Sequence, residues 1–239
     1  MKANFKNMSG TKDDEMRPEY DFTQGVRNIH AYRFSKLSSD EALILGYWQG
    51  KGFTVTGFSK RELRDMKTPD FLLARNGQEI ALCEVKSYQR DAWLEEQMKQ
   101  VAPGELAGGL RNDPIYNRIS HSIHTAVQQF SSVNADHSRL NFLVLVNHDT
   151  SARYKDLVSV LTGYWDPLGG DFDRTHLQFS EGRIREDKKQ IDLCVWLEIR
   201  KDGTLGRDHL FFPNPDTRVE VCGILDIDPE KVRDIPPAA

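Results

Sequence analysis

The run of residues from Leu140 to Asn147, LNFLVLVN, limits the fold of this chain more than any other segment. All of its residues except the second and the last are apolar, so apolar and polar side chains do not alternate along it. A strand without such alternation is typically buried on both faces, in the interior of a covered sheet. The run therefore predicts a central strand in a domain that combines helices with a sheet.

Helix and strand signals lie on both sides of this run. A helix opens at Ser38 or Ser39, where a hydroxyl can cap it and acidic residues of the first turn suit its dipole. Asn76-Gly77 is a strong signal for a tight hairpin turn. Residue spacing predicts further helices at 91–101, 115–130 and 151–162, and strands at 53–58, 69–75, 79–87, 191–199 and 209–212. The order of helix, three-strand meander, helix, buried strand and helix indicates an α/β fold class.

Four parts of the chain differ in composition. Residues 1–16 are polar and lack periodicity, so we expect a disordered tail. Residues 17–35 are richer in aromatic side chains and predict an N-terminal arm that packs on the domain. Residues 36–165 form the predicted core, and residues 166–239 form a C-terminal, strand-containing extension packed on it. The role of that extension is open between completing the sheet, forming a homodimer face and binding a partner.

Composition excludes several classes of protein. No apolar run approaches the ~18 residues of a membrane-spanning helix, and the N-terminus lacks the apolar segment of a secretory signal. Cys83, Cys194 and Cys222 are spaced too widely for a disulfide framework or a zinc signature. We therefore expect a cytoplasmic protein without a membrane partner. The net charge of −4 excludes a strongly basic coat, so a polyanionic partner would need a local basic patch.

Three charged residues stand on strands that are otherwise apolar. Asp70 begins one strand, and Glu84 and Lys86 lie near the end of the strand that follows the hairpin turn. Because side chains alternate along a strand, Glu84 and Lys86 point to one face and Cys83 points to the other. Unpaired charge is unfavourable inside a protein, so these residues need a reason to be there. Two carboxylates and a carbonyl suit Mg²⁺ or Mn²⁺, and a lysine can orient water or steady charge on a phosphate.

In these residues the chain resembles the PD-(D/E)XK, or restriction-endonuclease-like, nuclease superfamily. The likeness rests on Pro69-Asp70 and Glu84-Val85-Lys86 in a strand–turn–strand unit, and the order of elements extends it over residues 36–149. The resemblance implies a restriction-endonuclease-like core in which Asp70, Glu84 and the Val85 carbonyl bind metal and Lys86 is the catalytic lysine. The superfamily often adds an acidic residue from the first helix, for which Glu41 is the candidate and Asp40 the alternative.

Further basic residues and histidines are candidates for contacts with nucleic acid. Lys60, Arg61, Arg64 and Lys67 precede the first motif strand. They would contact phosphates beside the metal, or form a solvated turn with their acidic neighbours. Arg111, in the loop 103–114, would contact phosphate, or belong to a loop that only connects two elements. The two histidines, His121 and His124, would line the cleft, bind metal together with a third ligand, or lie on a solvent-facing side of their helix. The candidates are Lys60, Arg61, Arg64, Lys67, Arg111, His121 and His124.

The stretch from Met16 to Arg27 is similar to a short segment at the end of some bacterial toxin–antitoxin antitoxins. That similarity implies a bacterial source and a protein partner for the N-terminal arm. From the motif we expect a Mg²⁺- or Mn²⁺-dependent nuclease that cleaves phosphodiester bonds in DNA through Asp70, Glu84 and Lys86. The alternative is a catalytically inactive nuclease-fold module that binds protein or nucleic acid in a toxin–antitoxin or phage-defence context.

Overall fold

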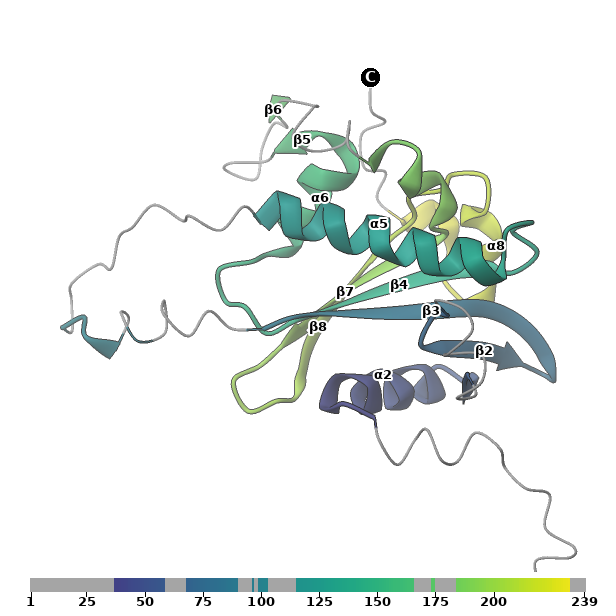
Figure 1. The fold of residues 1–239 in the computed structure, drawn as a ribbon, viewed down its shortest axis with the longest axis horizontal. Helices are drawn as coiled ribbons and strands as arrows, with labels where there is room; N and C mark the ends of the chain where they lie inside the picture. The colour runs from purple at the N-terminus through teal and green to yellow at the C-terminus, as the bar shows by residue number, and fades with distance from the viewer. Residues whose placement is uncertain are drawn as a thin grey trace, which may run out of the picture.

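The computed structural model describes residues 37–58, 68–89, 96, 99–102, 115–165, 173–174 and 184–232 (Figure 1). Helices cover a mixed sheet, so the α/β class predicted from the sequence is confirmed. The elements are α2 Ser39–Gly50, β1 Thr54–Gly57, β2 Phe71–Arg75, β3 Gln78–Tyr88, α5 Ile115–Val133, β4 Leu140–Asn147, α6 Tyr154–Thr162, β5 Tyr164–Trp165, β6 Asp173–Arg174, η3 Asp187–Gln190, β7 Leu193–Ile199, β8 Leu205–Phe211, α8 Arg218–Ile224 and η4 Pro229–Lys231.

Within the described residues, the main sheet has six strands in the order β1-β2-β3-β4-β7-β8. The first three strands form an antiparallel meander, as the sequence predicted. Strand β3 then pairs with β4 in parallel, β4 pairs with β7 in parallel, and β8 closes the sheet antiparallel to β7. Strands β5 and β6 form a separate two-stranded sheet. The predicted buried strand, β4, therefore lies inside the main sheet.

The core consists of two apolar layers, one on each face of this sheet. Helices α5 and α6 cover one face and α2 covers the other (Figure 1). All eight residues of β4 are buried. Leu143 and Leu145 pack in the layer with α5, whereas Phe142 and Val144 pack in the layer with α2. Burial on both faces explains why this strand is apolar without alternation.

Local signals in the sequence correspond to local geometry. Ser38 caps α2, and Glu41 completes a capping box with it. Asn76 and Gly77 have φ values of 53° and 79°, which is the left-handed backbone that the hairpin turn between β2 and β3 requires. Cys83, Cys194 and Cys222 are all buried free thiols. Within the described residues, no helix combines the length and hydropathy that a membrane span needs.

The C-terminal part of the chain contributes to the same sheet as the predicted core. Strands β7 and β8 come after residue 165, yet β7 lies directly beside β4. The sheet therefore crosses the boundary that composition suggested. The predicted tail (1–16), the N-terminal arm (17–35), the loop 103–114 and most of the predicted helix 91–101 lie outside the described residues.

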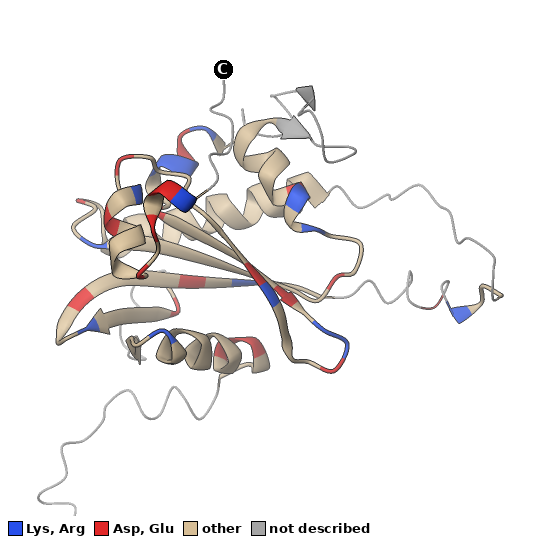
Figure 2. Cartoon of the chain, turned by 180° about the vertical axis from the view of Figure 1, so that it is seen from behind, with Lys and Arg blue, Asp and Glu red and all other residues tan. Residues whose placement is uncertain are grey.

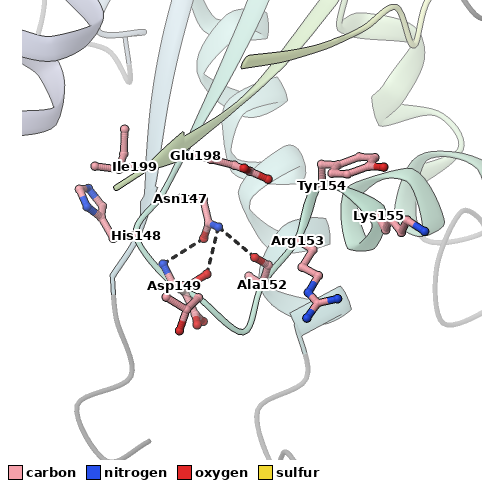
Figure 3. Close-up of a pocket in the computed structure, with 10 residues that line it drawn as sticks. Asn147, His148, Asp149, Ala152, Arg153, Tyr154, Lys155, Glu198 and Ile199 are labelled. Carbon is pink, nitrogen blue, oxygen red and sulfur yellow. Dashed lines mark hydrogen bonds between the residues drawn. The ribbon is translucent and has the colours of Figure 1, made fainter. Parts of the chain in front are cut away.

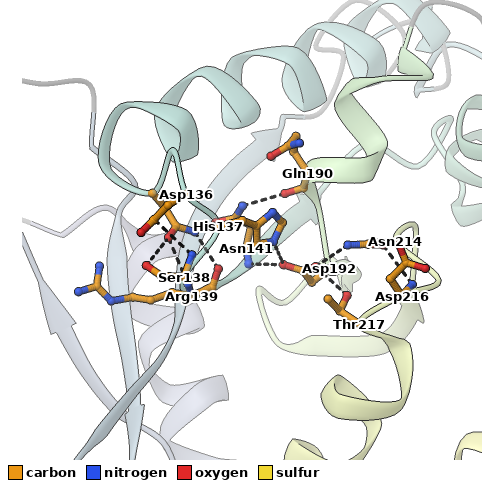
Figure 4. A network of polar contacts seen from close by, with 11 residues as sticks. Asp136, His137, Ser138, Arg139, Asn141, Gln190, Asp192, Asn214, Asp216 and Thr217 are labelled. Atoms are coloured by element: carbon orange, nitrogen blue, oxygen red, sulfur yellow. Dashed lines mark hydrogen bonds and ion pairs between the residues drawn. The ribbon is translucent and has the colours of Figure 1, made fainter.

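Asp192 joins the segments around the start of β7 (Figure 4). Its side chain is fully buried. One carboxylate oxygen accepts hydrogen bonds from Asn214 Nδ2 at 3.0 Å and Thr217 Oγ1 at 2.7 Å. The other accepts from the backbone N–H of Asn141 at 2.7 Å and contacts His137 Nε2 at 2.7 Å. One carboxylate thus connects the turn after α5, the start of β4 and the segment leading to α8.

Candidate functional site

The motif residues of β3 lie on the face of the sheet that α5 covers. Leu82 packs in the layer with α5, whereas Cys83 packs in the layer with α2. Alternation along β3 therefore directs Glu84 and Lys86 toward α5. Their side chains meet there, with 2.6 Å between Lys86 Nζ and Glu84 Oε1. The structure brings these two predicted residues together on one face.

A glutamine of α5 completes the cluster. Lys86 Nζ donates a hydrogen bond to Gln129 Oε1 at 2.9 Å, and Gln129 Nε2 donates to the backbone carbonyl of Thr68 at 3.1 Å. Sequence reasoning did not single out Gln129. Helical periodicity places Gln129 at the border of the apolar stripe of α5 and Gln128 on the polar side with His124, but no local pattern indicates what Gln129 contacts. Only the packing of α5 on β3 shows that Gln129 reaches Lys86.

Asp70 stands just before β2, where that strand departs from β3. The last paired residues of the two strands are Phe71 and Cys83. One step beyond that pair, Asp70 Oδ2 accepts a hydrogen bond from the backbone N–H of Val85 at 2.8 Å. The side chain thus provides an acceptor for a backbone N–H of β3 that lies beyond the last residue paired with β2. This contact holds the Asp70 carboxylate beside the residue that follows Glu84.

Glu84 has an unusual electrostatic environment. Its side chain is 2% exposed, and its Oε2 atom has no hydrogen-bond partner among the described residues. Burial, followed by the negative charge of Asp70, raises the pKa of Glu84 to about 8, although Lys86 and the amide of Gln129 act in the opposite direction. A buried carboxylate with an unpartnered oxygen beside a second carboxylate favours the uptake of a cation or a proton.

These residues fit a hydrated divalent cation. Asp70 and Glu84 provide hard carboxylate oxygens, and the unpartnered Oε2 of Glu84 leaves one oxygen for a ligand bond. In the described part of the chain, no three His, Cys, Asp or Glu residues are grouped so as to hold a metal. Mg²⁺ commonly binds through one or two carboxylates and keeps several waters, so a pair of carboxylates lies within the range of ligand sets that Mg²⁺ uses.

The structure does not bring Glu41 to this cluster. Its Oε2 accepts a hydrogen bond from the backbone N–H of Ser38 at 2.7 Å, which is the reciprocal half of the capping box. The alternative, Asp40, is buried against His148, with 2.9 Å between Asp40 Oδ1 and His148 Nε2. Both residues belong to α2, which covers the face opposite to that of Glu84 and Lys86. Helix capping accounts for the position of Glu41.

The structure describes only the two histidines among the candidate nucleic-acid contacts. The other five, Lys60, Arg61, Arg64, Lys67 and Arg111, lie outside the described residues. His121 and His124 are exposed on α5. His124 contacts Asp187 Oδ2 at 3.0 Å through Nδ1 and Gln128 at 2.9 Å through Nε2, so it faces η3. Figure 2 shows acidic and basic residues interspersed along the described elements.

A separate pocket opens at the carboxyl ends of β4 and β7 (Figure 3). It has a volume of about 390 Å³, and its lining includes Arg153 and Tyr154 at the start of α6 and Glu198 of β7. None of the motif residues lines it. Arg118 lies between this pocket and β3, with its guanidinium 5.2 Å from the centre of the Tyr88 ring and 3.5 Å from Asp149 Oδ2. The sequence contained no signal for this pocket.

Asp70, Glu84, Lys86 and Gln129 together offer two carboxylates, an ammonium and a neutral amide around the end of β3. Such a set can bind a hard cation and place a positive charge next to it. None of the protein-family models matches this chain, and no curated protein or solved structure matches it either.

Proposed function

We propose that this chain is a metal-dependent nuclease of the PD-(D/E)XK type that hydrolyses phosphodiester bonds in DNA. The observation that carries the proposal is the environment of Glu84. Its Oε2 is buried without a partner in the described structure, the charge of Asp70 acts on it, and Lys86 touches its other oxygen. This combination of groups suits metal-assisted hydrolysis of a phosphodiester better than it suits a simple structural ion pair.

Each residue has a distinct part in the proposed reaction. Asp70 and Glu84, with the Val85 carbonyl, would hold Mg²⁺ or Mn²⁺, which when bound supplies Lewis acidity and lowers the pKa of a water. Lys86 orients the attacking water or stabilises negative charge on the phosphate, because its ammonium stands beside the Glu84 carboxylate without being a ligand itself. Asp70 remains close to the strand through the Val85 N–H.

The arrangement of elements supports a restriction-endonuclease-like core. An antiparallel meander carries both halves of the motif, and α5 follows it along the chain. The buried strand β4 then pairs with the motif strand β3 in parallel. This is the order of elements that the resemblance implied, with β7 and β8 extending the sheet beyond it.

The second candidate function is a binding module of the same fold without catalysis. It is favoured by the contact between Lys86 and Glu84, because an ion pair of 2.6 Å satisfies part of the charge that a cation would satisfy. The net charge of −4 also favours a partner other than a long polyanion. In this alternative the cluster stabilises the hairpin, and the partner is a protein or a nucleic acid.

A cleavage assay separates the two functions. Plasmid, linear double-stranded DNA, single-stranded DNA and RNA are each incubated with the wild-type chain in Mg²⁺, in Mn²⁺ and in EDTA. We expect cleavage of DNA that EDTA abolishes. Cleavage that persists in EDTA, or no cleavage of any substrate, would contradict the nuclease and favour the binding module.

Variants of the motif then test the assigned roles. Lys86→Ala should abolish cleavage while Mn²⁺ still binds in a calorimetric titration, because the lysine is not a ligand. Asp70→Ala should lose cleavage and Mn²⁺ binding together, because it removes one of two ligand charges. Thermal melts must show that both variants are folded. Near wild-type cleavage by Lys86→Ala would contradict the proposed mechanism.

A further inference from the structure

We infer that Gln129 is a positioning residue of this site, which holds the ammonium of Lys86 in place through a carboxamide anchored on the backbone of Thr68. The inference rests on the proposed function, since it gives Gln129 a part in the same cluster. Gln129 lies 43 residues from Lys86 along the chain and belongs to α5 rather than to the motif strands.

The chemistry of the three groups determines the orientation of the Gln129 amide. An ammonium can only donate hydrogen bonds, and a backbone carbonyl can only accept them. The oxygen of Gln129 must therefore face Lys86 Nζ, at 2.9 Å, and its nitrogen must face the Thr68 carbonyl, at 3.1 Å. A flipped amide would lose both contacts, so the side chain has one favourable orientation.

Gln129 itself and the Thr68 carbonyl that it contacts lie in well-packed parts of the structure. Ala126 and Phe130, which flank Gln129 on α5, are 0% and 1% exposed and fix the helix on the sheet. Thr68, which provides the carbonyl, is 5% exposed. Lys86 by contrast has a long, flexible side chain that is 23% exposed. A rigid neutral acceptor therefore limits the positions that its ammonium can occupy.

The contact between Gln129 and Lys86 matters most when Glu84 binds a divalent cation. In the described structure Glu84 and Gln129 are the two hydrogen-bond partners of the Lys86 ammonium. A Glu84 carboxylate that shares its charge with a divalent cation attracts the ammonium less, and two positive charges repel each other. Gln129 is then the partner that keeps Lys86 near the phosphate. An ammonium makes three hydrogen bonds, so one donor is left for water or substrate.

The first test compares two neighbouring glutamines. Gln129→Met removes both polar contacts at similar volume, and Gln128→Met is the matched control because Gln128 is exposed and contacts His124 instead. We expect kcat of Gln129→Met to fall by about 10- to 100-fold, with KM and Mn²⁺ affinity within about threefold of wild type. The control should cleave like wild type. A fall in Mn²⁺ affinity that matches the fall in kcat would overturn the positioning role.

The second test needs neither metal nor cleavage. The protein is labelled with ¹⁵N and kept in EDTA, and the ammonium resonance of Lys86 is assigned by its absence in Lys86→Ala. We expect hydrogen exchange of this ammonium to be at least about fivefold faster in Gln129→Met than in wild type or Gln128→Met, because one of its two acceptors is gone. Equal exchange rates in all three proteins would overturn the inference.

A shorter variant and the two readouts together keep the outcomes distinct. If thermal melts show that Gln129→Met is unfolded, Gln129→Asn replaces it, because its side chain is one methylene too short to span Thr68 and Lys86. If the wild-type chain cleaves nothing, the proposed function fails, and the exchange rates alone decide whether Gln129 positions Lys86. If cleavage occurs but the exchange rates are equal, the inference fails and the proposed function stands.

Discussion

At the scale of single residues, Glu84 makes the strongest prediction. Its pKa is raised from an ordinary 4.5 to about 8 by burial and by Asp70, so the folded protein binds this proton more tightly than the unfolded chain does. In EDTA, the contribution of Glu84 to the free energy of unfolding should therefore be fully present below pH 4.5. It should decrease above that pH and be lost as the pH rises through 8. Glu84→Gln removes this effect, because its amide stays neutral.

Calorimetry in EDTA at pH 5 and pH 9 measures the difference. We expect Glu84→Gln to melt close to wild type at pH 5 and roughly 3–6 °C above it at pH 9. Glu79→Gln is the control, because Glu79 is 49% exposed in an ion pair with Arg139. It should follow the pH dependence of wild type. A Glu84→Gln protein that is less stable than wild type at pH 9 would show that the contact with Lys86 outweighs burial.

At the scale of secondary-structure elements, the start of α2 decides between two roles for Glu41. Its carboxylate accepts from the backbone N–H of Ser38, on the face of the sheet opposite to Glu84. We expect Glu41→Gln to leave Mn²⁺ affinity within about twofold of wild type, because it provides no ligand. Ser38→Ala should lower the unfolding free energy by about 1 kcal/mol. A tenfold loss of Mn²⁺ affinity in a fully folded Glu41→Gln protein would restore Glu41 to the metal site.

The buried carboxylate of Asp192 connects elements that are distant in the sequence (Figure 4). It accepts hydrogen bonds from Asn214, Thr217 and the backbone of Asn141 while it is fully buried. Asp192→Ala leaves these donors without a partner, so we expect a loss of about 3–5 kcal/mol in urea unfolding. Asp216→Ala, at an exposed position nearby, should change stability by less than about 0.5 kcal/mol. Equal stability of the two variants would contradict the structural importance of this network.

At the scale of the whole molecule, the sheet makes the chain after residue 165 part of the core. Strand β7 pairs with β4, and Trp196 and Leu197 of β7 are fully buried. A chain ending at residue 165 would expose β4 as an apolar edge strand, which favours aggregation. We expect this fragment to lack the cooperative melting transition of the full chain in calorimetry. A cooperative melt of the fragment would show that residues 36–165 fold on their own.

Much of the fold and part of the site were predictable from the sequence, because the signals involved are local. The Asn76-Gly77 turn, the Ser38 cap and the apolar β4 depend on residues close together in the chain. Alternation along β3 likewise placed Glu84 and Lys86 on the same face. The acidic residue expected from α2 was harder to place, because the same carboxylate at a helix start can cap the helix or bind a ligand.

The sequence by itself determined the α/β class, the hairpin and the pair of Glu84 and Lys86, since these follow from the geometry of a strand and of a turn. Tertiary structure alone decided that α5 and α2 cover opposite faces, and thereby that Gln129 meets Lys86 while Glu41 does not. It also decided that β7 lies beside β4. These outcomes depend on packing between segments far apart in the chain, where burial of apolar surface selects the arrangement and no local pattern encodes the partner.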